Sequence, residues 1–307
     1  MKNNILLLGS TGFLGTNFIQ LFKPGIEETL FTPSRSELNL ENISELNDYL
    51  KENEINTIIN CAAFVGGISF GYRYQADLLY KNTLMTNNIY NSSVMNNVNK
   101  IINPISNCAY PENIVTYKEE DFWNGKPHDS VFYYALAKRH IIALSSAFKT
   151  QYNLSSVNVV LSNMYGPNDH FEESRSHALG ALIKKIYNAH IKNEPSVLIW
   201  GTGKPIREWL FVEDGARSLI RSINLETDVP FFNIGINKGI SVIDLAELIA
   251  KYINYSGEFQ LDFSKPDGVP EKTVDGSLGA EILNWSPEVD LNRGIKKTVD
   301  WYIKKNG

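Results

Sequence analysis

Two residues of the stretch VFYYALAKRH could together move a proton to or from a bound molecule. Tyr134 and Lys138 are four positions apart, and this spacing places both on one face of a helix. A phenol has an ordinary pKa of about 10, and a nearby ammonium lowers it because the positive charge favours the phenolate. We therefore expect Tyr134 to act as an acid or base near neutral pH, with Lys138 as the cation that tunes it.

A hydroxyl and a thiol lie two positions apart in the stretch SNCAY, directly after an apolar run that is typical of a buried strand. A hydride added to a ketone carbon leaves an oxyanion that needs a proton, and a serine hydroxyl can hydrogen-bond the same oxygen. Ser106, at the end of the run, is placed for this role. Taken alone, these residues also fit ordinary helix packing and a small buried cysteine at Cys108.

Three glycines of the N-terminal stretch ILLLGSTGFLG recur every third residue, between an apolar run and a helical pattern. Glycine lets the backbone turn tightly and approach a pyrophosphate, and the next helix directs its N-terminal N–H groups at that charge. This position favours a dinucleotide site over a glycine turn that binds nothing. The expected cofactor contacts here are Gly9, Thr11, Gly12, Phe13, Leu14 and Gly15.

The second apolar run indicates which dinucleotide binds. Sheets that bind NAD usually carry an acidic residue at the end of the second strand, where it holds the ribose hydroxyls. The stretch TLFTPSRSELNL has Ser34 and Arg35 at that place instead. An arginine offers a fork of donors to a 2′-phosphate, so the sequence favours NADP over NAD. The alternative is an arginine that only contacts water.

Short apolar runs alternate with helical patterns in the first half of the chain. Strands are predicted at 5–8, 29–32, 57–60, 100–104 and 156–161. Helices are predicted at 13–22, 43–52, 78–95 and 132–152. Such alternation is typical of an α/β protein with a Rossmann-type, doubly wound parallel sheet, which binds its ligands beyond the carboxyl ends of the strands.

The second half has a looser pattern, which predicts a smaller C-terminal substrate lobe. Helices are predicted at 178–192, 242–252 and 295–303, with a strand at 231–234. We assign residues 1–165 to a dinucleotide-binding domain, with later returns near 205–240. Residues 166–204 and 241–307 are assigned mainly to the substrate lobe.

Composition argues against several other classes of protein. The chain has 307 residues, a net charge of −5 and two cysteines. A nucleic-acid surface depends on clustered cations, and no long basic block is present. Two cysteines cannot form a disulfide framework, which favours a reducing compartment. No apolar run is long enough for a membrane span or a signal peptide, so we expect a cytoplasmic protein. We predict no metal site.

The motifs together resemble one family over nearly the whole chain. They include GSTGFLG, RSELNL, AAFVGGI, SNCAYP, YYALAK, NMYGPND, SHALGALI, WGTGKPIREWLFVED and SKPDG. In this order they resemble the extended short-chain dehydrogenase/reductases. Within that group they most resemble the GDP-L-fucose synthases, which epimerise GDP-4-keto-6-deoxymannose at C3 and C5 and reduce it at C4. The resemblance implies an NADPH-dependent oxidoreductase for a GDP-linked keto sugar, working as a homodimer.

The resemblance also implies roles for single residues. Ser106 would lie at the carbonyl that is reduced, and Cys108 with His177 would move protons at the flanking carbons. Thiols and imidazoles, with ordinary pKa values of about 8.5 and 6.5, can do so near neutral pH. Further cofactor contacts implied are Asn39, Leu40, Ala62 and Ala63. Implied substrate contacts are Asn163, Lys185, Trp200, Arg207, Lys265 and Asp267, with the arginine at the diphosphate.

Three departures from the family's pattern leave the sugar and part of the cofactor assignment open. Phe64 replaces a common lysine, Glu271 a common basic residue, and Thr11 a common arginine. One alternative is therefore a C4 reductase without epimerase activity, acting on a related GDP-4-keto sugar such as a heptose. An alternative from another class is a non-enzymatic sensor that binds a dinucleotide.

Overall fold

The computed structural model describes residues 2–172, 178–265, 267 and 269–306. Six of the described strands form one parallel sheet in the order β2-β1-β3-β4-β6-β11. Their bounds are β1 Asn3–Leu8, β2 Glu28–Phe31, β3 Thr57–Asn60, β4 Lys100–Ser106, β6 Ser155–Leu161 and β11 Phe232–Ile234. The order reverses between β1 and β3, and such a reversal is where doubly wound sheets bind their ligands.

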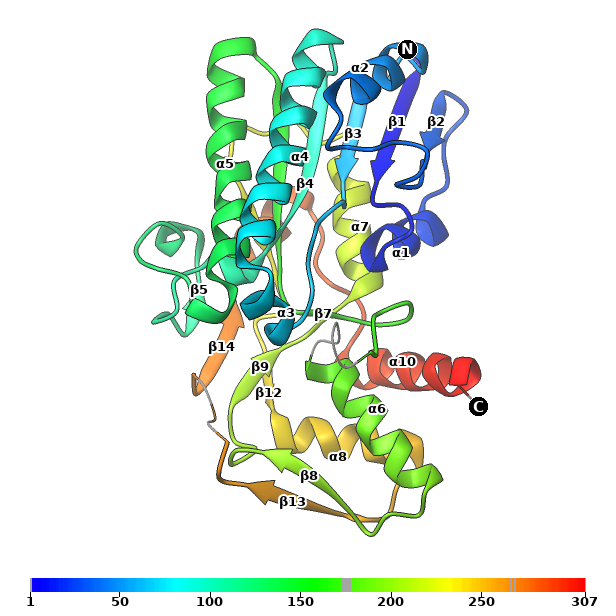
Figure 1. Ribbon diagram of the computed structural model, residues 1–307, viewed down its shortest axis with the longest axis vertical. Helices are drawn as coiled ribbons and strands as arrows, with labels where there is room; N and C mark the ends of the chain where they lie inside the picture. Colours follow the sequence, from blue (N-terminus) through cyan, green and yellow to red (C-terminus); the bar gives the residue numbers. More distant parts are fainter. Residues whose placement is uncertain (1, 173–177, 266, 268, 307) are drawn as a thin grey trace.

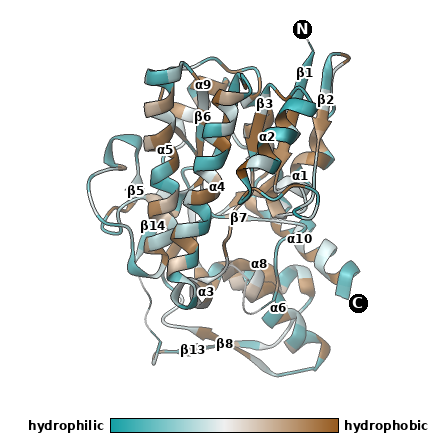
Figure 2. Ribbon diagram, turned by 45° about the horizontal axis from the view of Figure 1, so that its top comes forward, coloured by the Kyte–Doolittle hydropathy of each residue, from teal (hydrophilic) through white to brown (hydrophobic). Residues whose placement is uncertain are grey.

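Helices cover both faces of this sheet, which explains why its strands are mainly apolar (Figure 2). In β1, Ile5 and Leu7 pack against one set of helices, and Leu6 and Leu8 pack against the other. The first set is α1 Phe13–Leu21, α7 Val212–Ser222 and α9 Ser277–Leu283. The second set is α2 Ile43–Glu52, α4 Gln75–Met95 and α5 Phe132–Tyr152. The predicted α/β fold with a doubly wound parallel sheet is confirmed.

A smaller lobe lies below the carboxyl ends of the strands (Figure 1). Its apolar core lies between α6 Ala178–Ile191, α8 Val242–Ile253, α10 Leu291–Asn306 and β8 Ser196–Trp200, which pairs with β13 Glu258–Asp262. A second small sheet joins the lobe to the main domain in the order β12-β9-β14-β5. Its strands are β5 Thr116–Tyr117, β9 Ile206–Glu208, β12 Gly239–Ser241 and β14 Glu271–Val274.

The remaining elements are short and connect these two parts. They are α3 Ile68–Arg73, η1 Asn107–Ala109, η2 Glu119–Asp121, η3 Asp129–Val131, β7 Met164–Tyr165 and β10 Leu210–Phe211. None of the helices within the described ranges combines the length and the apolar character needed to cross a membrane.

Most predicted elements agree with the structure to within a few residues, and two differ for a physical reason. The fourth strand continues to Ser106 rather than ending at residue 104, because residues 104–106 extend the parallel pairing with β6. The last helix begins at Leu291 rather than at residue 295. Gly294 interrupts its apolar pattern, yet glycine is needed there because any Cβ would collide with the Tyr165 hydroxyl.

Candidate active site

The first two turns of α5 bring Tyr134 and Lys138 to the carboxyl edge of the sheet. Lys138 is only 6% exposed, and its ammonium donates a hydrogen bond of 3.0 Å to the carbonyl of Pro104 in β4. The same ammonium lies 5.6 Å from the centroid of the Tyr134 ring. Pro104 is two residues before Ser106. Tyr134 and Lys138 therefore lie against the end of β4, the strand that carries the predicted hydroxyl.

The chain turns sharply after β4, so Ser106 and Cys108 share one turn. The Ser106 Oγ accepts a hydrogen bond of 3.3 Å from the backbone N–H of Cys108, so Ser106 caps the short helix η1. Burial raises the pKa of Tyr134, and the electrostatic interaction with Cys108 raises it further. The thiol and the phenol therefore lie near enough to influence each other. Four predicted catalytic residues thus gather at one strand end, whereas His177 lies outside the described residues.

The direction predicted for the pKa of Tyr134 is wrong. We expected Lys138 to lower that pKa, but burial raises it. The ammonium is itself removed from water, which lowers the pKa of Lys138 to about 8. A phenol with a raised pKa stays protonated at neutral pH. Tyr134 is therefore suited to donate a proton to an oxyanion.

The Cys108 thiol is also less acidic than the sequence suggested. Both cysteines are free. Burial raises the pKa of Cys108, although a hydrogen bond with Ser106 and the charge of Lys138 oppose the rise. Burial raises the pKa of Cys61 to about 12, and Cys61 packs against the core beneath the glycine turn. Cys108 is consequently a protonated thiol at neutral pH, not a group that titrates there as expected.

The glycine turn after β1 has the geometry of an anion cradle. Gly9 has a φ of +72°, and a Cβ there would lie 2.6 Å from the backbone N of Ala62. A Cβ on Gly15 would collide with the Gly9 carbonyl. Gly12 is the N-cap of α1, and no described side chain caps that helix end. The first N–H groups of α1 are therefore available to a phosphate, and the residues present fit a dinucleotide.

The loop after β2 is more acidic than the sequence pattern suggested. Arg35 pairs with Glu41 at 3.0 Å, although its side chain is 78% exposed. The backbone N–H of Ser34 donates to the Glu37 carboxylate at 2.7 Å. The sequence analysis predicted no acidic residue at the end of this strand and overlooked Glu37. The chain folds back there, so that the Glu37 carboxylate lies beside Ser34. A 2′-phosphate here would have to replace Glu41 as the partner of Arg35.

The other predicted cofactor residues differ in what they can offer. Leu14 and Leu40 are buried in apolar clusters, so only their backbones can face a ligand. Exposed or half-buried positions are found for Thr11, Phe13, Asn39, Ala62 and Ala63.

Two half-buried cations lie side by side between the lobe and the main domain. The pairing of β14 with β9 sets Lys272 opposite Arg207, and the Lys272 ammonium lies 5.1 Å from the Tyr117 ring centroid. Burial lowers the pKa of both cations. Neither forms an ion pair with a carboxylate of the described residues. Such a pair fits a ligand with two negative charges.

Sequence reasoning missed Lys272, because it considered only the departure at the neighbouring Glu271. The strand pairing that sets Lys272 beside Arg207 joins segments far apart in the chain. The available signal was Lys272 itself, a basic residue directly after Glu271, the position where the family commonly has one.

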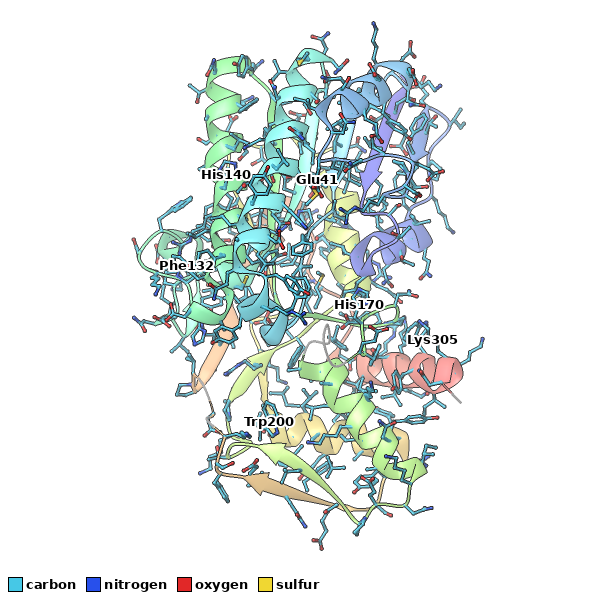
Figure 3. All side chains as sticks on the ribbon, viewed as in Figure 1. Glu41, Phe132, His140, His170, Trp200 and Lys305 are labelled. Carbon is cyan, nitrogen blue, oxygen red and sulfur yellow. The ribbon has the colours of Figure 1, made fainter. Side chains whose placement is uncertain are left out.

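Three of the remaining predicted substrate residues gather on the lobe. Trp200, 67% exposed, lies at the end of β8 (Figure 3), and the Lys265 ammonium lies 5.6 Å from its ring centroid. Asp267 accepts hydrogen bonds from the backbone and hydroxyl of Thr202 at 2.6 and 2.7 Å. An aromatic face with an amine beside it is a suitable surface for a nucleobase.

The last two predicted substrate residues use their polar groups within the protein. The Lys185 ammonium donates to the carbonyl of Leu198 in β8. The Asn163 side chain donates to the carbonyl of Glu208 at 3.0 Å, in the strand that carries Arg207. These contacts hold the lobe's strands and leave fewer donors for a ligand than the sequence suggested.

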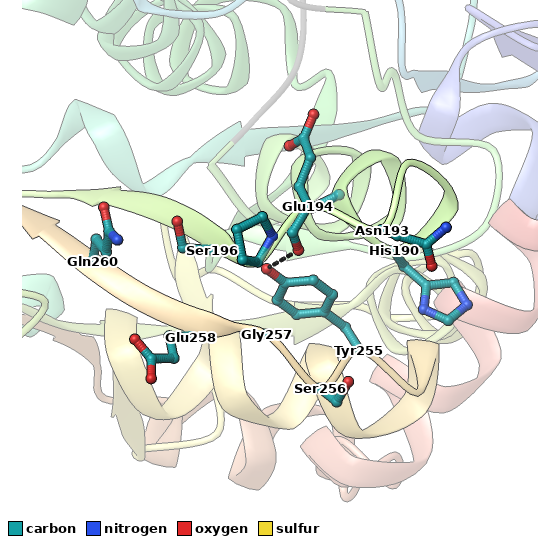
Figure 4. Close-up of a pocket in the computed structure, with 11 residues that line it drawn as sticks. His190, Asn193, Glu194, Ser196, Tyr255, Ser256, Gly257, Glu258 and Gln260 are labelled. Carbon is teal, nitrogen blue, oxygen red and sulfur yellow. Dashed lines mark hydrogen bonds between the residues drawn. The ribbon is translucent and has the colours of Figure 1, made fainter.

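A surface pocket of about 570 Å³ opens at the start of β8, at the opposite end of that strand from Trp200. Figure 4 shows the residues that line it. It is lined by residues between 189 and 196 and between 255 and 260. Tyr255 donates a hydrogen bond of 3.1 Å to the Glu194 carbonyl across it. Its lining contains no predicted site residue, so the candidate active site remains the strand end beside α5.

Comparison with known proteins agrees with this geometry and defines the class of the protein. Residues 5–235 match the NAD dependent epimerase/dehydratase family, and the chain belongs to this family, a group of extended short-chain dehydrogenase/reductases.

Its similarity to particular members extends over nearly its full length. The chain is 31% identical to GDP-L-fucose synthase of Escherichia coli (strain K12), covering 99% of this chain and 97% of that protein. It is 33% identical to GDP-L-colitose synthase of Yersinia pseudotuberculosis, covering 98% of each. Among solved structures, a GDP-mannoheptose C4 reductase from Campylobacter jejuni with NADP bound has a TM-score of 0.87 and 25% identity, covering 98% of each chain.

Proposed function

We propose that the protein is an NADPH-dependent reductase of the 4-keto group of a GDP-linked 6-deoxy sugar, which it also epimerises at C3 and C5. The observation that carries this proposal is the contact between α5 and the end of β4, which brings Tyr134 and Lys138 to Ser106. Its relatives support the sugar class, because the proteins named for GDP-L-fucose and GDP-L-colitose match nearly the whole chain.

The chain's own groups account for the reduction. When bound, NADPH supplies a hydride to C4 of the sugar. Ser106 would hold the C4 oxygen by a hydrogen bond, and the protonated Tyr134 would give its proton to the alkoxide. Lys138 would favour the phenolate that remains. The raised pKa of Tyr134 suits this direction, because a proton donor must be protonated before it acts.

NADP is proposed as the cofactor because the residues at both ends of its site suit it. The glycine turn and the uncapped start of α1 suit the pyrophosphate. The Arg35–Glu41 pair lies at the surface, where an ion pair contributes little. Exchanging Glu41 for a doubly charged phosphate is therefore favourable for the arginine. The Campylobacter jejuni relative is named with NADP bound.

Arg207 and Lys272 are proposed to bind the substrate diphosphate, with Trp200 and Lys265 beside the nucleobase. The two cations are half-buried and lack a described carboxylate partner, which suits a ligand that brings two negative charges. We assign residues 1–165, with the returns near 205–240, to the dinucleotide, and most of residues 166–204 and 241–307 to the substrate. We further propose a homodimer that works in the cytoplasm.

Epimerisation is proposed to use Cys108 as the acid. The 4-keto group acidifies the hydrogens at C3 and C5, so a base can remove one and an acid can return a proton to the other face. The buried, protonated Cys108 suits the second role, and we propose His177, which the resemblance pairs with Cys108, for the first. A C4 reductase acting on a heptose is the alternative, which the similarity to the Campylobacter jejuni enzyme favours.

Two experiments test the proposal. The first follows NADPH oxidation with GDP-4-keto-6-deoxymannose and compares the protein with its Tyr134→Phe variant. We expect turnover by the unmodified protein only, and equal NADPH binding by the unmodified protein and the variant. Turnover by the variant would overturn the assignment of Tyr134. The second incubates the substrate in deuterated water without NADPH. Deuterium at C3 and C5 supports epimerisation, whereas its absence leaves the reductase alternative.

A further inference from the structure

Arg139, which follows Lys138 in α5, makes three hydrogen bonds to the loop that carries the thiol. Its Nε donates to the carbonyl of Ala109 at 2.8 Å. Its two terminal nitrogens donate to the carbonyls of Phe122 and Gly125, both at 2.9 Å. The guanidinium carbon also lies 5.5 Å from the Phe122 ring centroid and 5.7 Å from that of Trp123.

These contacts use the particular shape of an arginine side chain. The three carbonyls lie on different parts of the loop, and a planar guanidinium can donate in several directions at once. Burial lowers the pKa of Arg139, and its side chain contacts these carbonyls and rings. The protein therefore keeps a partly buried cation here whose described hydrogen bonds all go to backbone.

Together, Lys138 and Arg139 hold the backbone on both sides of the candidate catalytic turn. Lys138 donates to the carbonyl of Pro104, two residues before Ser106. Arg139 donates to the carbonyl of Ala109, one residue after Cys108. The turn that carries the hydroxyl and the thiol is thus fixed at both ends by adjacent residues of the helix that carries Tyr134.

We propose that Arg139 is a positioning residue, which holds Cys108 and Ser106 at a fixed place relative to Tyr134. The value of this position for catalysis rests on the proposed function. The mechanical effect does not, because the thiol reports on the loop without any substrate. Failure of the reductase assignment and failure of this proposal are therefore separate outcomes.

The test measures how fast iodoacetamide labels each cysteine in the protein and in its Arg139→Met variant, by mass spectrometry of the two peptides. Methionine keeps much of the side chain's length but removes the donors. Without the three Arg139 hydrogen bonds the loop opens locally, and we expect Cys108 to be labelled about tenfold faster. Cys61 lies after β3 and packs against the core beneath the glycine turn. None of the three Arg139 hydrogen bonds reaches it, so its rate should stay within about twofold.

A second variant and a control complete the experiment. Arg139→Lys keeps the charge but not the planar set of donors. Its Cys108 labelling rate should therefore fall between those of the unmodified protein and the methionine variant. This variant replaces the methionine variant in the test if that one does not fold. Lys149→Met, on the same helix but bonded to Asn153, should change neither rate. An unchanged Cys108 rate in the folded variants, or an equal rise at both cysteines, would overturn the proposal.

Discussion

Replacing Lys138 by methionine should make the ligand-free protein more stable at neutral pH while it removes the reductase activity. Burial lowers the pKa of this lysine from 10.5 to about 8. At about 1.4 kcal/mol per pKa unit, keeping the ammonium charged inside the protein costs about 3 kcal/mol. Methionine avoids that cost but loses the hydrogen bond to the Pro104 carbonyl, which contributes about 1 kcal/mol. The net gain is about 2 kcal/mol.

This gain should disappear at alkaline pH. Between the folded and unfolded pKa values of Lys138, the unfolded chain binds more protons, so rising pH stabilises the folded protein. At about pH 9.5 the lysine recovers about 2 kcal/mol and should match the methionine variant. At about pH 7 the variant should melt about 3 °C higher.

Thermal unfolding of both proteins at the two pH values, without cofactor, measures the effect. Lys149→Met is the matched control, because Lys149 is exposed on the same helix, and its midpoint should stay within about 1 °C of the unmodified protein. The reasoning is refuted if Lys138→Met is less stable at about pH 7. It is equally refuted if the advantage is the same at both pH values.

Three further substitutions test the other parts of the site. Gly15→Ala should weaken NADPH binding at least about tenfold in a fluorescence titration, because its Cβ collides with the Gly9 carbonyl; Gly25→Ala, at a surface turn, is the control, and equal affinities would contradict the cradle. Lys272→Met should raise KM for the GDP-sugar about tenfold with little change in kcat, and an unchanged KM would remove Lys272 from the diphosphate site. Cys108→Ser should abolish inversion at C3 and C5 while C4 reduction continues, so a product that is still epimerised would exclude the thiol as the acid.

The sequence predicted the fold well where local pattern decides structure. The run Ile5–Leu8 and the glycines after it are readable because every β1 residue there is buried and the turn demands glycine. The four-residue spacing of Tyr134 and Lys138 likewise depends only on the helix. These features are encoded over a few neighbouring residues, so composition and periodicity are sufficient to find them.

Features that depend on burial or on distant strands could not be predicted in this way. The pKa of Tyr134 is raised because the folded chain excludes water, and no local pattern reports that. Lys272 becomes a neighbour of Arg207 only through the pairing of β14 with β9. Arg139 reads as an ordinary helix arginine until the loop beyond Cys108 folds onto it.

The most direct test of the central claim uses NADPH that carries deuterium on the transferred position of its nicotinamide ring. The account predicts that the GDP-sugar product gains one deuterium, bound to C4, and that the Tyr134→Phe variant transfers none. Deuterium that stays on the nicotinamide, passes to water or arrives at another sugar carbon would contradict it.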